Sequence, residues 1–173
     1  SPAGRNSPFV VLLQKNPQLR MYTFYDERSA AFFALGTARR QGRPVGVITT
    51  SGTAAGELLP AAMEAWMSQV PLLLITADRP SAYRGTGAPQ SAEQVGLYST
   101  YVEKTVDIEG DVSFEFTDWT GRQPIHLNVC FDEPLLSDAE LPRLGRAERA
   151  RPQKQSEGNP KVLQDFLNTA KHL

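Results

Sequence analysis

Charged side chains interrupt an aromatic and aliphatic stretch near the start of the chain. Residues 24–36 read FYDERSAAFFALG, so Asp26, Glu27 and Arg28 stand between two apolar segments. A carboxylate in such surroundings can act as a general acid or base, and an arginine can bind an anionic group. Acids are also favoured at helix starts, where they cap free amides and face the positive end of the helix dipole. These residues alone leave both interpretations open.

Four further segments combine glycine, polar or basic residues with a position at or near the end of an expected strand. They are GRNS at 4–7, which fits only if a strand precedes it, TSGTAA at 50–55, ADRP at 77–80 and GTGAPQ at 85–90. Ligands of open parallel sheets bind outside the carboxyl ends of the strands, where loops and helix N-termini converge. TSGTAA lacks the Gly-Lys-Ser/Thr ending of a P-loop and is weak evidence by itself. We therefore base the predicted site on the convergence of the segments.

Hydrophobic patterns predict the elements that position these segments. Apolar or β-prone runs predict strands at residues 19–25, 43–50, 72–77, 100–108 and 123–131. Helical spacing predicts helices at residues 9–16, between Glu27 and Gly42, at 53–68 and at 91–99. Alternating strands and helices indicate an α/β fold with a mainly parallel sheet flanked by helices and right-handed crossovers.

Local details refine this prediction. Ser7 and Thr53 are expected as N-caps, and Pro8 as the first residue of its helix. Helical spacing of Ala30, Phe33, Ala34 and Thr37 indicates the inward face of the helix after Glu27. The continuous apolar run at 43–50 is typical of a strand buried on both faces. Pro60 predicts a kink or a helix boundary within 53–68.

Two places do not fit a complete α/β unit. The segment between Ile108 and Gln123 is too short and too β-prone for a crossover helix of ordinary length, although the flanking strands are expected to be parallel neighbours. At the N-terminus, residues 1–8 resemble a loop that should follow a strand. We expect residues to be absent from both places. Residues 137–160 are polar and charged, which indicates a linker, and 161–173 can form a terminal helix.

The totals exclude several classes of protein. The chain has 173 residues, of which 40% are hydrophobic, enough for one substantial core. Its net charge of −1 gives no basic field to hold nucleic acid or an anionic membrane. One cysteine, Cys130, and two distant histidines, His126 and His172, do not make a disulfide or a zinc site. No apolar run approaches the roughly 20 residues of a membrane helix. We expect a cytoplasmic protein without nucleic-acid partners or stable membrane insertion, in which His126 packs in the core.

Several segments, taken together, resemble one family. FYDERSAAFFALG, RPVGVITTSGTAA, LLPAAMEA, PLLLITADRP and PIHLNVCFDEPLL are similar, in this order, to the N-terminal domain of the 2-succinyl-5-enolpyruvyl-6-hydroxy-3-cyclohexene-1-carboxylate synthases, the MenD family of thiamine-diphosphate enzymes. The resemblance implies that residues 1–136 form a pyrimidine-binding domain that lacks its first strand and an internal helical segment. Residues 137–173 would be a linker and possible start of a central domain.

The resemblance also implies an activity and its residues. Members join decarboxylated 2-oxoglutarate to isochorismate in menaquinone biosynthesis, with thiamine diphosphate and Mg²⁺, and the protein would associate with other copies of itself as a dimer or tetramer. Glu27 matches the catalytic glutamate, whose carboxyl group hydrogen-bonds a ring nitrogen of the aminopyrimidine and favours its imino tautomer. The implied cofactor contacts besides Glu27 are Thr50, Ser51, Gly52 and Thr53, and the implied substrate contacts are Arg5, Arg79 and Gln90.

The chain departs from the family pattern in three ways. Pro2-Ala3-Gly4-Arg5 replaces Pro-Gly-Ser-Arg, which removes a serine hydroxyl expected to bind a substrate carboxylate. Gly87-Ala88-Pro89-Gln90 replaces Gly-Ala-Asn-Gln. No Gly-Asp-Gly followed by a downstream Asn, the family's pattern for holding Mg²⁺ and the diphosphate, is present. No metal ligand is therefore assigned within this chain, and the chain alone is expected to be inactive.

Two other functions stay open at this point. One is another thiamine-diphosphate decarboligase resembling acetolactate synthase, against which the combination of DERSAAFFALG and ADRP argues. The other is a non-catalytic α/β assembly module, which the missing magnesium-binding pattern keeps open. The length of the natural protein would separate the enzyme from the module, because an enzyme of this family extends well beyond Leu173.

Overall fold

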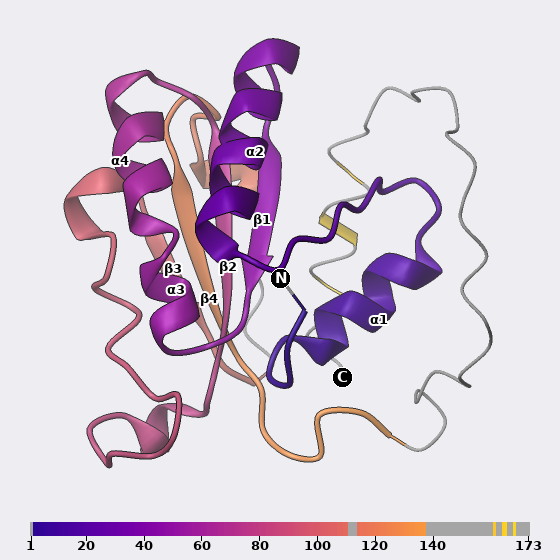
Figure 1. Cartoon of the computed structure of the whole chain (residues 1–173), viewed down its shortest axis with the longest axis vertical. Coiled ribbons are helices and arrows are strands. Elements are labelled where there is room, and N and C mark those ends of the chain that lie inside the picture. Colours follow the sequence, from indigo (N-terminus) through magenta and orange to yellow (C-terminus); the bar gives the residue numbers. More distant parts are fainter. Residues whose placement is uncertain (1, 111–113, 138–160, 162–163, 166–167, 169–173) are drawn as a thin grey trace.

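One parallel sheet forms the centre of the molecule. The computed structural model describes residues 2–110 and 114–137, together with residues 161, 164, 165 and 168. Its strands are β1 (Val45–Thr49), β2 (Leu72–Asp78), β3 (Thr105–Ile108) and β4 (Ile125–Cys130). They lie in the order β1-β2-β4-β3, and every neighbouring pair is parallel. The predicted α/β fold with a parallel sheet flanked by helices is confirmed (Figure 1).

Helices cover the sheet and connect its strands. They are α1 (Ser7–Lys15), α2 (Glu27–Gln41), α3 (Thr53–Gly56) and α4 (Leu59–Met67). Short 3₁₀ turns follow at η1 (Ser81–Tyr83), η2 (Ser99–Tyr101) and η3 (Phe116–Asp118). In Figure 1, α2 and α4 lie beside each other against the sheet, while α1 lies apart from them.

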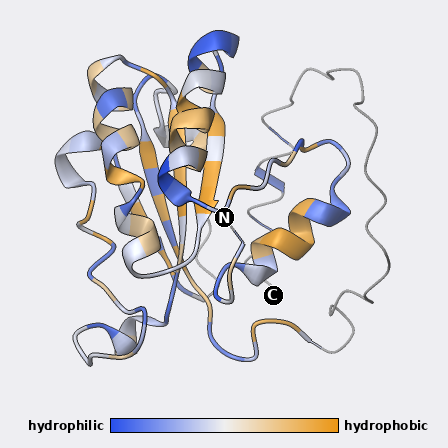
Figure 2. Ribbon diagram, in the orientation of Figure 1, coloured by the Kyte–Doolittle hydropathy of each residue, from blue (hydrophilic) through white to orange (hydrophobic). Residues whose placement is uncertain are grey.

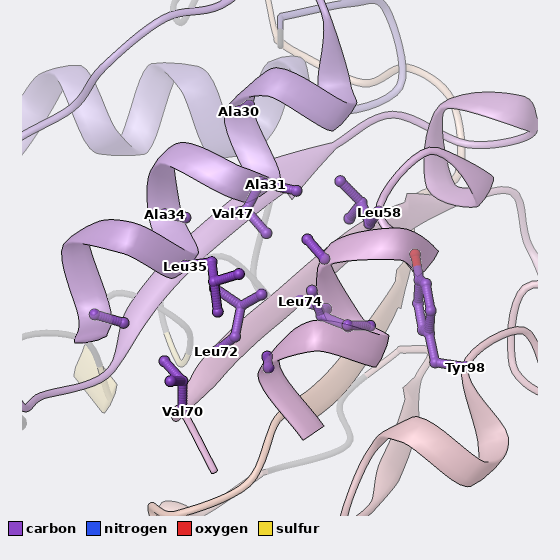
Figure 3. Close-up of a cluster of buried hydrophobic side chains, with 14 of the residues drawn as sticks. Ala30, Ala31, Ala34, Leu35, Val47, Leu58, Val70, Leu72, Leu74 and Tyr98 are labelled. Atoms are coloured by element: carbon purple, nitrogen blue, oxygen red, sulfur yellow. The ribbon is translucent and has the colours of Figure 1, made fainter. Parts of the chain in front are cut away.

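Two hydrophobic clusters pack on opposite faces of the sheet, because side chains alternate along each strand. On one face, Val47, Leu72 and Leu74 pack with the alanines of α2 and α4 and with Tyr98 (Figure 3). The other face carries Leu73, Ile75, Ile125 and Leu127, and Phe9 of α1 packs against it. Figure 2 shows hydrophobic stretches in the strands of the sheet and in α1. Burial of these two faces is the main source of the stability of the fold.

The strands differ in how deeply they are buried. All residues of β2 are buried, as the apolar run at 72–77 predicts. The prediction that 43–50 is buried on both faces is wrong, because only Val47 and Thr49 of β1 are buried and Gly46 is exposed. Among the described residues β1 pairs with β2 alone, so it is an edge strand whose second side lacks a covering strand.

Helix α2 begins and ends at the residues that the sequence indicates. Asp26 caps its N-terminus, and Gly42 follows its last turn in the left-handed conformation at φ 62°. Its buried face carries smaller side chains than predicted. Of the predicted residues, Phe33 is exposed and Thr37 only half-buried. The residues that face the sheet are Ala30, Ala31, Ala34, Leu35 and Ala38. Small side chains let this helix approach the sheet closely.

Two predicted N-caps are displaced by one residue. Asn6, not Ser7, precedes α1, and Gly52, not Thr53, precedes α3. The N-cap position of α3 has φ 79°, a conformation that favours glycine over threonine. The predicted break near Pro60 is confirmed, since α3 and α4 are separate helices and Pro60 stands in the first turn of α4.

Two predicted elements are wrong, and several strands are shorter than predicted. Residues 19–25 form no strand. The rings of Tyr22 and Phe24 instead pack against Phe33 of α2, and none of the strand pairs among the described residues includes 19–25. Residues 91–99 form no α-helix, and only η2 begins at their end. The strands expected at 100–108 and 123–131 are confirmed as the shorter β3 and β4.

The parts of the chain with irregular patterns are described incompletely. Between β3 and β4, the described residues contain η3 as their regular element, and residues 111–113 lie outside the described part. The predicted linker at 137–160 lies outside it apart from residue 137. Of the predicted helix at 161–173, residues 161, 164, 165 and 168 are described and helical. Among the residues that the structure describes, no helix has both the length and the apolar character to span a membrane.

Candidate functional site

The carboxyl ends of the strands and the first turns of α2 and α3 lie at the same edge of the sheet. This arrangement follows from parallel strands joined by helices, since each crossover returns the chain to the opposite edge. In Figure 1 the start of α2 lies level with the end of β1, and the turn into α3 follows directly. Helix N-termini present free backbone amides at such an edge, which favours polar or anionic ligands.

The two acids at the start of α2 occupy different positions. Asp26 is exposed, and its Oδ1 accepts a hydrogen bond from the Ser29 amide at 2.6 Å. Hydrogen bonding to Ser29 lowers the pKa of Asp26 below its usual value. Glu27 is half-buried, and no hydrogen bond or ion pair engages its carboxylate among the described residues. Asp26 therefore serves as the helix cap, while Glu27 keeps both carboxylate oxygens for another partner.

The turn after β1 is buried and tightly fitted. Thr49, Thr50 and Ser51 are almost inaccessible to solvent, with exposed fractions of 0%, 3% and 2%. The hydroxyl oxygens of Thr49 and Thr50 have no hydrogen-bond partner among the described residues. Gly52 follows with φ 79° and ψ −137°. A buried hydroxyl without a partner is costly, so these two side chains mark a place where a polar ligand would be stabilised.

Gly52 also brings a distant loop to this turn. A Cβ atom added at Gly52 would lie 3.1 Å from the Cα of Gln90 and 3.2 Å from its carbonyl oxygen. Gln90 itself has φ 55°, an uncommon conformation for a residue with a side chain. The structure thus brings together two of the predicted site residues, and it does so through backbone contact that requires glycine at position 52.

Arg79 joins the same group from the end of β2. Its Nε donates a hydrogen bond to the Pro89 carbonyl at 2.9 Å, and its guanidinium lies 5.7 Å from the centre of the Tyr83 ring. The two terminal guanidinium nitrogens have no hydrogen-bond partner among the described residues. Because Pro89 precedes Gln90, Arg79 holds the loop that touches Gly52. It also retains donors with which to bind a carboxylate.

Arg5 lies at the carboxyl end of β4, where it contacts Phe131, whose amide donates to the Asp78 carbonyl. The exposed fraction of Arg5 is 7%. Nη1 donates to the Phe131 carbonyl, and Nη2 forms a hydrogen bond and ion pair with Glu133, both at 3.0 Å. β2 separates β4 from β1, and in the described part of the chain no hydrogen bond or ion pair joins Arg5 to Gly52, Gln90 or Arg79. Its charge is already partnered within the protein.

A buried polar network beneath the site was not predicted. Thr76 and Asn128 occupy neighbouring positions on β2 and β4, and Thr76 Oγ1 donates to Asn128 Oδ1 at 2.8 Å. Asn128 Nδ2 donates to Asp78 at 3.0 Å and to Asp107 at 2.8 Å. Gln94 completes the network, since its Nε2 donates to Asn128 Oδ1 at 2.9 Å. Thr76 and Asn128 could have been found from the sequence, because each is a polar residue inside an otherwise apolar strand. No local pattern marks Gln94.

One arginine, Arg84, pairs with both acids at the outer end of this network. Arg84 donates to both carboxylate oxygens of Asp107, at 2.8 and 2.9 Å, and lies 3.5 Å from Asp78. Burial raises the pKa of Asp107, but hydrogen bonds from Arg84 and Asn128 outweigh burial, so that pKa lies below its usual value. Burial raises the pKa of Cys130, beside these acids, to about 12. Asp107 stays ionised and the Cys130 thiol stays protonated at neutral pH.

His126 packs in the core, as predicted. It is fully buried, and its ring meets the Tyr98 ring edge to face at 4.6 Å. Its Nε2 lies 2.8 Å from Thr76 Oγ1. Since that hydroxyl donates to Asn128, Nε2 must carry the proton and donate to Thr76. Burial lowers the pKa of His126 to about 3. The ring is neutral at neutral pH.

Comparisons with known proteins agree with the geometry. The family described as "Thiamine pyrophosphate enzyme, N-terminal TPP binding domain" matches residues 1–97. A 2-succinyl-5-enolpyruvyl-6-hydroxy-3-cyclohexene-1-carboxylate synthase of Bdellovibrio bacteriovorus is 47% identical over 98% of this chain and 33% of its own length. Proteins of the same name from Akkermansia muciniphila and Geobacillus kaustophilus are 48% and 41% identical over 77% and 79% of this chain.

The chain matches only part of the length of these relatives. It spans 33%, 25% and 26% of the three curated relatives. The family match covers β1, β2 and the loop that contains Gln90 and Gln94, which are the elements that build the edge described above. The chain therefore belongs to the thiamine pyrophosphate enzymes and contains their N-terminal TPP binding domain.

Proposed function

We propose that this chain is the pyrimidine-binding part of a synthase that joins decarboxylated 2-oxoglutarate to isochorismate in menaquinone biosynthesis. The observation that carries the proposal is the group formed by the Thr50–Thr53 turn, Gln90 and Arg79 at the carboxyl edge of the sheet. The names of relatives 40–48% identical to this chain support the choice of substrates. The synthase is proposed to work in the cytoplasm.

The residues of the turn fit the ring of thiamine diphosphate. The unpartnered hydroxyls of Thr49 and Thr50 are buried polar atoms that a ring with amino and aza nitrogens would satisfy. Gly52 has no side chain, and the Gln90 backbone fills the space that its Cβ would take, so this loop closes on the turn. Half-buried Glu27 begins α2 at the same edge and has a free carboxylate. When bound, this cofactor supplies an electron sink for the decarboxylation of a 2-oxo acid.

Within this proposal each residue has a defined task. Glu27 accepts or donates a proton at a ring nitrogen of the pyrimidine and so sets its tautomer. Arg79 binds a substrate carboxylate with its terminal nitrogens, and Gln90 donates or accepts a hydrogen bond beside it. Arg5 contributes positive charge while its donors remain bound to Phe131 and Glu133. The departure Gly4, next to Arg5, removes a hydroxyl from this side of the site.

The diphosphate and Mg²⁺ are assigned to residues outside this chain. The sequence lacks the Gly-Asp-Gly and downstream Asn that the resemblance requires for them. We propose that another copy of the full-length protein faces the pyrimidine site, so that dimers or tetramers are the active form. Exposed apolar side chains that such a contact would cover include Tyr25, Phe32 and Met67.

The test is Glu27→Gln in the full-length protein. The carboxamide has the size of the carboxylate but cannot exchange a proton, so turnover should fall roughly 10²–10⁴-fold, the usual contribution of acid-base catalysis. Turnover is measured as carbon dioxide released from 2-oxoglutarate in the presence of isochorismate, thiamine diphosphate and Mg²⁺. Circular dichroism checks that the variant is folded.

Asp26→Asn is the matched control. Asparagine caps helices as well as aspartate, so the hydrogen bond to Ser29 survives and α2 stays intact. This variant should keep turnover within about threefold of wild type, a difference of about 0.7 kcal/mol. Equal losses in both variants would assign Glu27 to the helix start and refute its catalytic role. Wild-type protein that consumes pyruvate but not 2-oxoglutarate would refute the proposed substrates.

A further inference from the structure

Gln94 links the buried network to the turn after β1. Its side chain is fully buried, although the surrounding residues 91–94 belong to no helix or strand. Oε1 accepts a hydrogen bond from the Gly52 amide at 2.6 Å. Nε2 donates to Asn128 Oδ1 at 2.9 Å and to the Ala77 carbonyl at 3.3 Å. One side chain therefore connects the ends of β1, β2 and β4.

The chemistry of its neighbours determines which way the Gln94 amide faces. Asp78 and Asp107 are carboxylates that only accept hydrogen bonds when ionised, so the Asn128 amide nitrogen must face them. The Asn128 oxygen is then left to face Gln94, which must present its own nitrogen there. Its oxygen consequently faces Gly52. A reversed Gln94 amide would place two donors against each other at Gly52 and two acceptors at Asn128.

The hydrogen bond from the Gly52 amide to Gln94 fixes the position of Gly52 in the turn. Gly52 is buried and stands directly before α3, where backbone amides have no partner within the helix. Its backbone also touches Gln90, as an added Cβ would lie 3.1 Å from the Gln90 Cα. A shift of Gly52 would therefore move Gln90, and it would move the neighbouring hydroxyls of Thr50 and Thr53 as well.

We propose that Gln94 is a positioning residue that holds the Gly52 turn in the geometry needed to receive the pyrimidine ring, with Asn128 setting the orientation of its amide. This inference rests on the proposed function for the identity of the ring, but the hydrogen bond to Gly52 can be tested without it. Neither Gln94 nor Asn128 contacts the ring in this proposal.

The first measurement is amide hydrogen exchange in the full-length protein without added cofactor. The wild-type Gly52 amide should be protected, and Gln94→Leu should speed its exchange at least tenfold while amides of β2 and β4 keep their wild-type rates. Gln94→Glu keeps an oxygen that can accept from Gly52 but sets its second oxygen against the Asn128 oxygen, so its Gly52 exchange rate should lie between those of wild type and Gln94→Leu. Thr76→Val is the matched control, since it removes a hydroxyl from the same network without touching Gly52.

The second measurement is thiamine diphosphate binding by calorimetry with Mg²⁺. Gln94→Leu should raise the dissociation constant about tenfold, whereas Thr76→Val should change it less than threefold. A wild-type Gly52 amide that exchanges at the unprotected rate would overturn the inference even if Gln94→Leu fails to fold. Equal exchange at Gly52 in wild type and Gln94→Leu would also overturn it. Absence of cofactor binding by wild type would instead refute the proposed function, and the exchange rates would still decide the role of Gln94.

Discussion

Replacement of Gly52 by alanine tests the close contact at the centre of the site. Gly52 has φ 79° and ψ −137°, close to a region of backbone space that residues with a Cβ avoid. Forcing a non-glycine residue into such a conformation costs about 1–3 kcal/mol. The new methyl would also lie 3.1–3.3 Å from three backbone atoms of Gln90, too close for an ordinary contact. Overpacking of this kind costs a further 1–3 kcal/mol, roughly.

The loss of stability expected for Gly52→Ala lies in the lower part of the range obtained by adding backbone strain and overpacking. Gln90 is exposed, so the loop that carries it can move outward and relieve part of the overlap. We expect Gly52→Ala to lower the free energy of unfolding by about 2–4 kcal/mol. Urea unfolding of the chain, followed by far-ultraviolet circular dichroism, would show this as a midpoint lowered by roughly 1–2 M.

Gly36→Ala is the control for a glycine that is not required. Gly36 lies on the exposed side of α2, and an added Cβ would meet nothing within 4 Å. Alanine there should raise the free energy of unfolding by about 0.5–1 kcal/mol, because it is the better helix former. A Gly52→Ala variant within about 0.5 kcal/mol of wild type would refute the geometry inferred for the turn.

Two further predictions concern pH and substrate binding. The pKa of His126 is about 3 in the folded chain and 6.5 in model compounds, so below pH 6.5 the unfolded state binds a proton that the folded state does not. The free energy of unfolding should therefore fall by about 2 kcal/mol between pH 7 and pH 5 in urea titrations, and His126→Leu should remove most of that difference. In the full-length synthase, Arg79→Ala should raise the Michaelis constant for a carboxylate substrate about tenfold or more, since a charge-assisted hydrogen bond contributes about 1.5–3 kcal/mol. Steady-state kinetics with each substrate varied in turn would measure this, and unchanged constants for both would exclude Arg79 as a contact.

The local sequence alone determines β2 and α2. β2 follows from an apolar run that can only be buried, and all of its residues are buried. α2 follows from a cap at Asp26 and a left-handed Gly42 at its end, both of which act within a few residues. The polar and glycine-containing junctions also predict that a site lies at the carboxyl edge, because parallel connections place all such junctions there.

Tertiary structure decides the features that depend on a distant partner. Residues 19–25 have strand-forming side chains, yet a strand exists only where another backbone accepts its hydrogen bonds, and Phe33 takes up the rings of Tyr22 and Phe24 instead. The segment 91–99 has a helical pattern, but its Gln94 amide is buried between Gly52 and Asn128. Those partners lie 42 and 34 residues away in sequence, so no local pattern can reveal which backbone amide Gln94 binds. The position of the site therefore follows from the order of its elements, whereas its exact shape follows from hydrogen bonds and contacts that form only when the strands assemble.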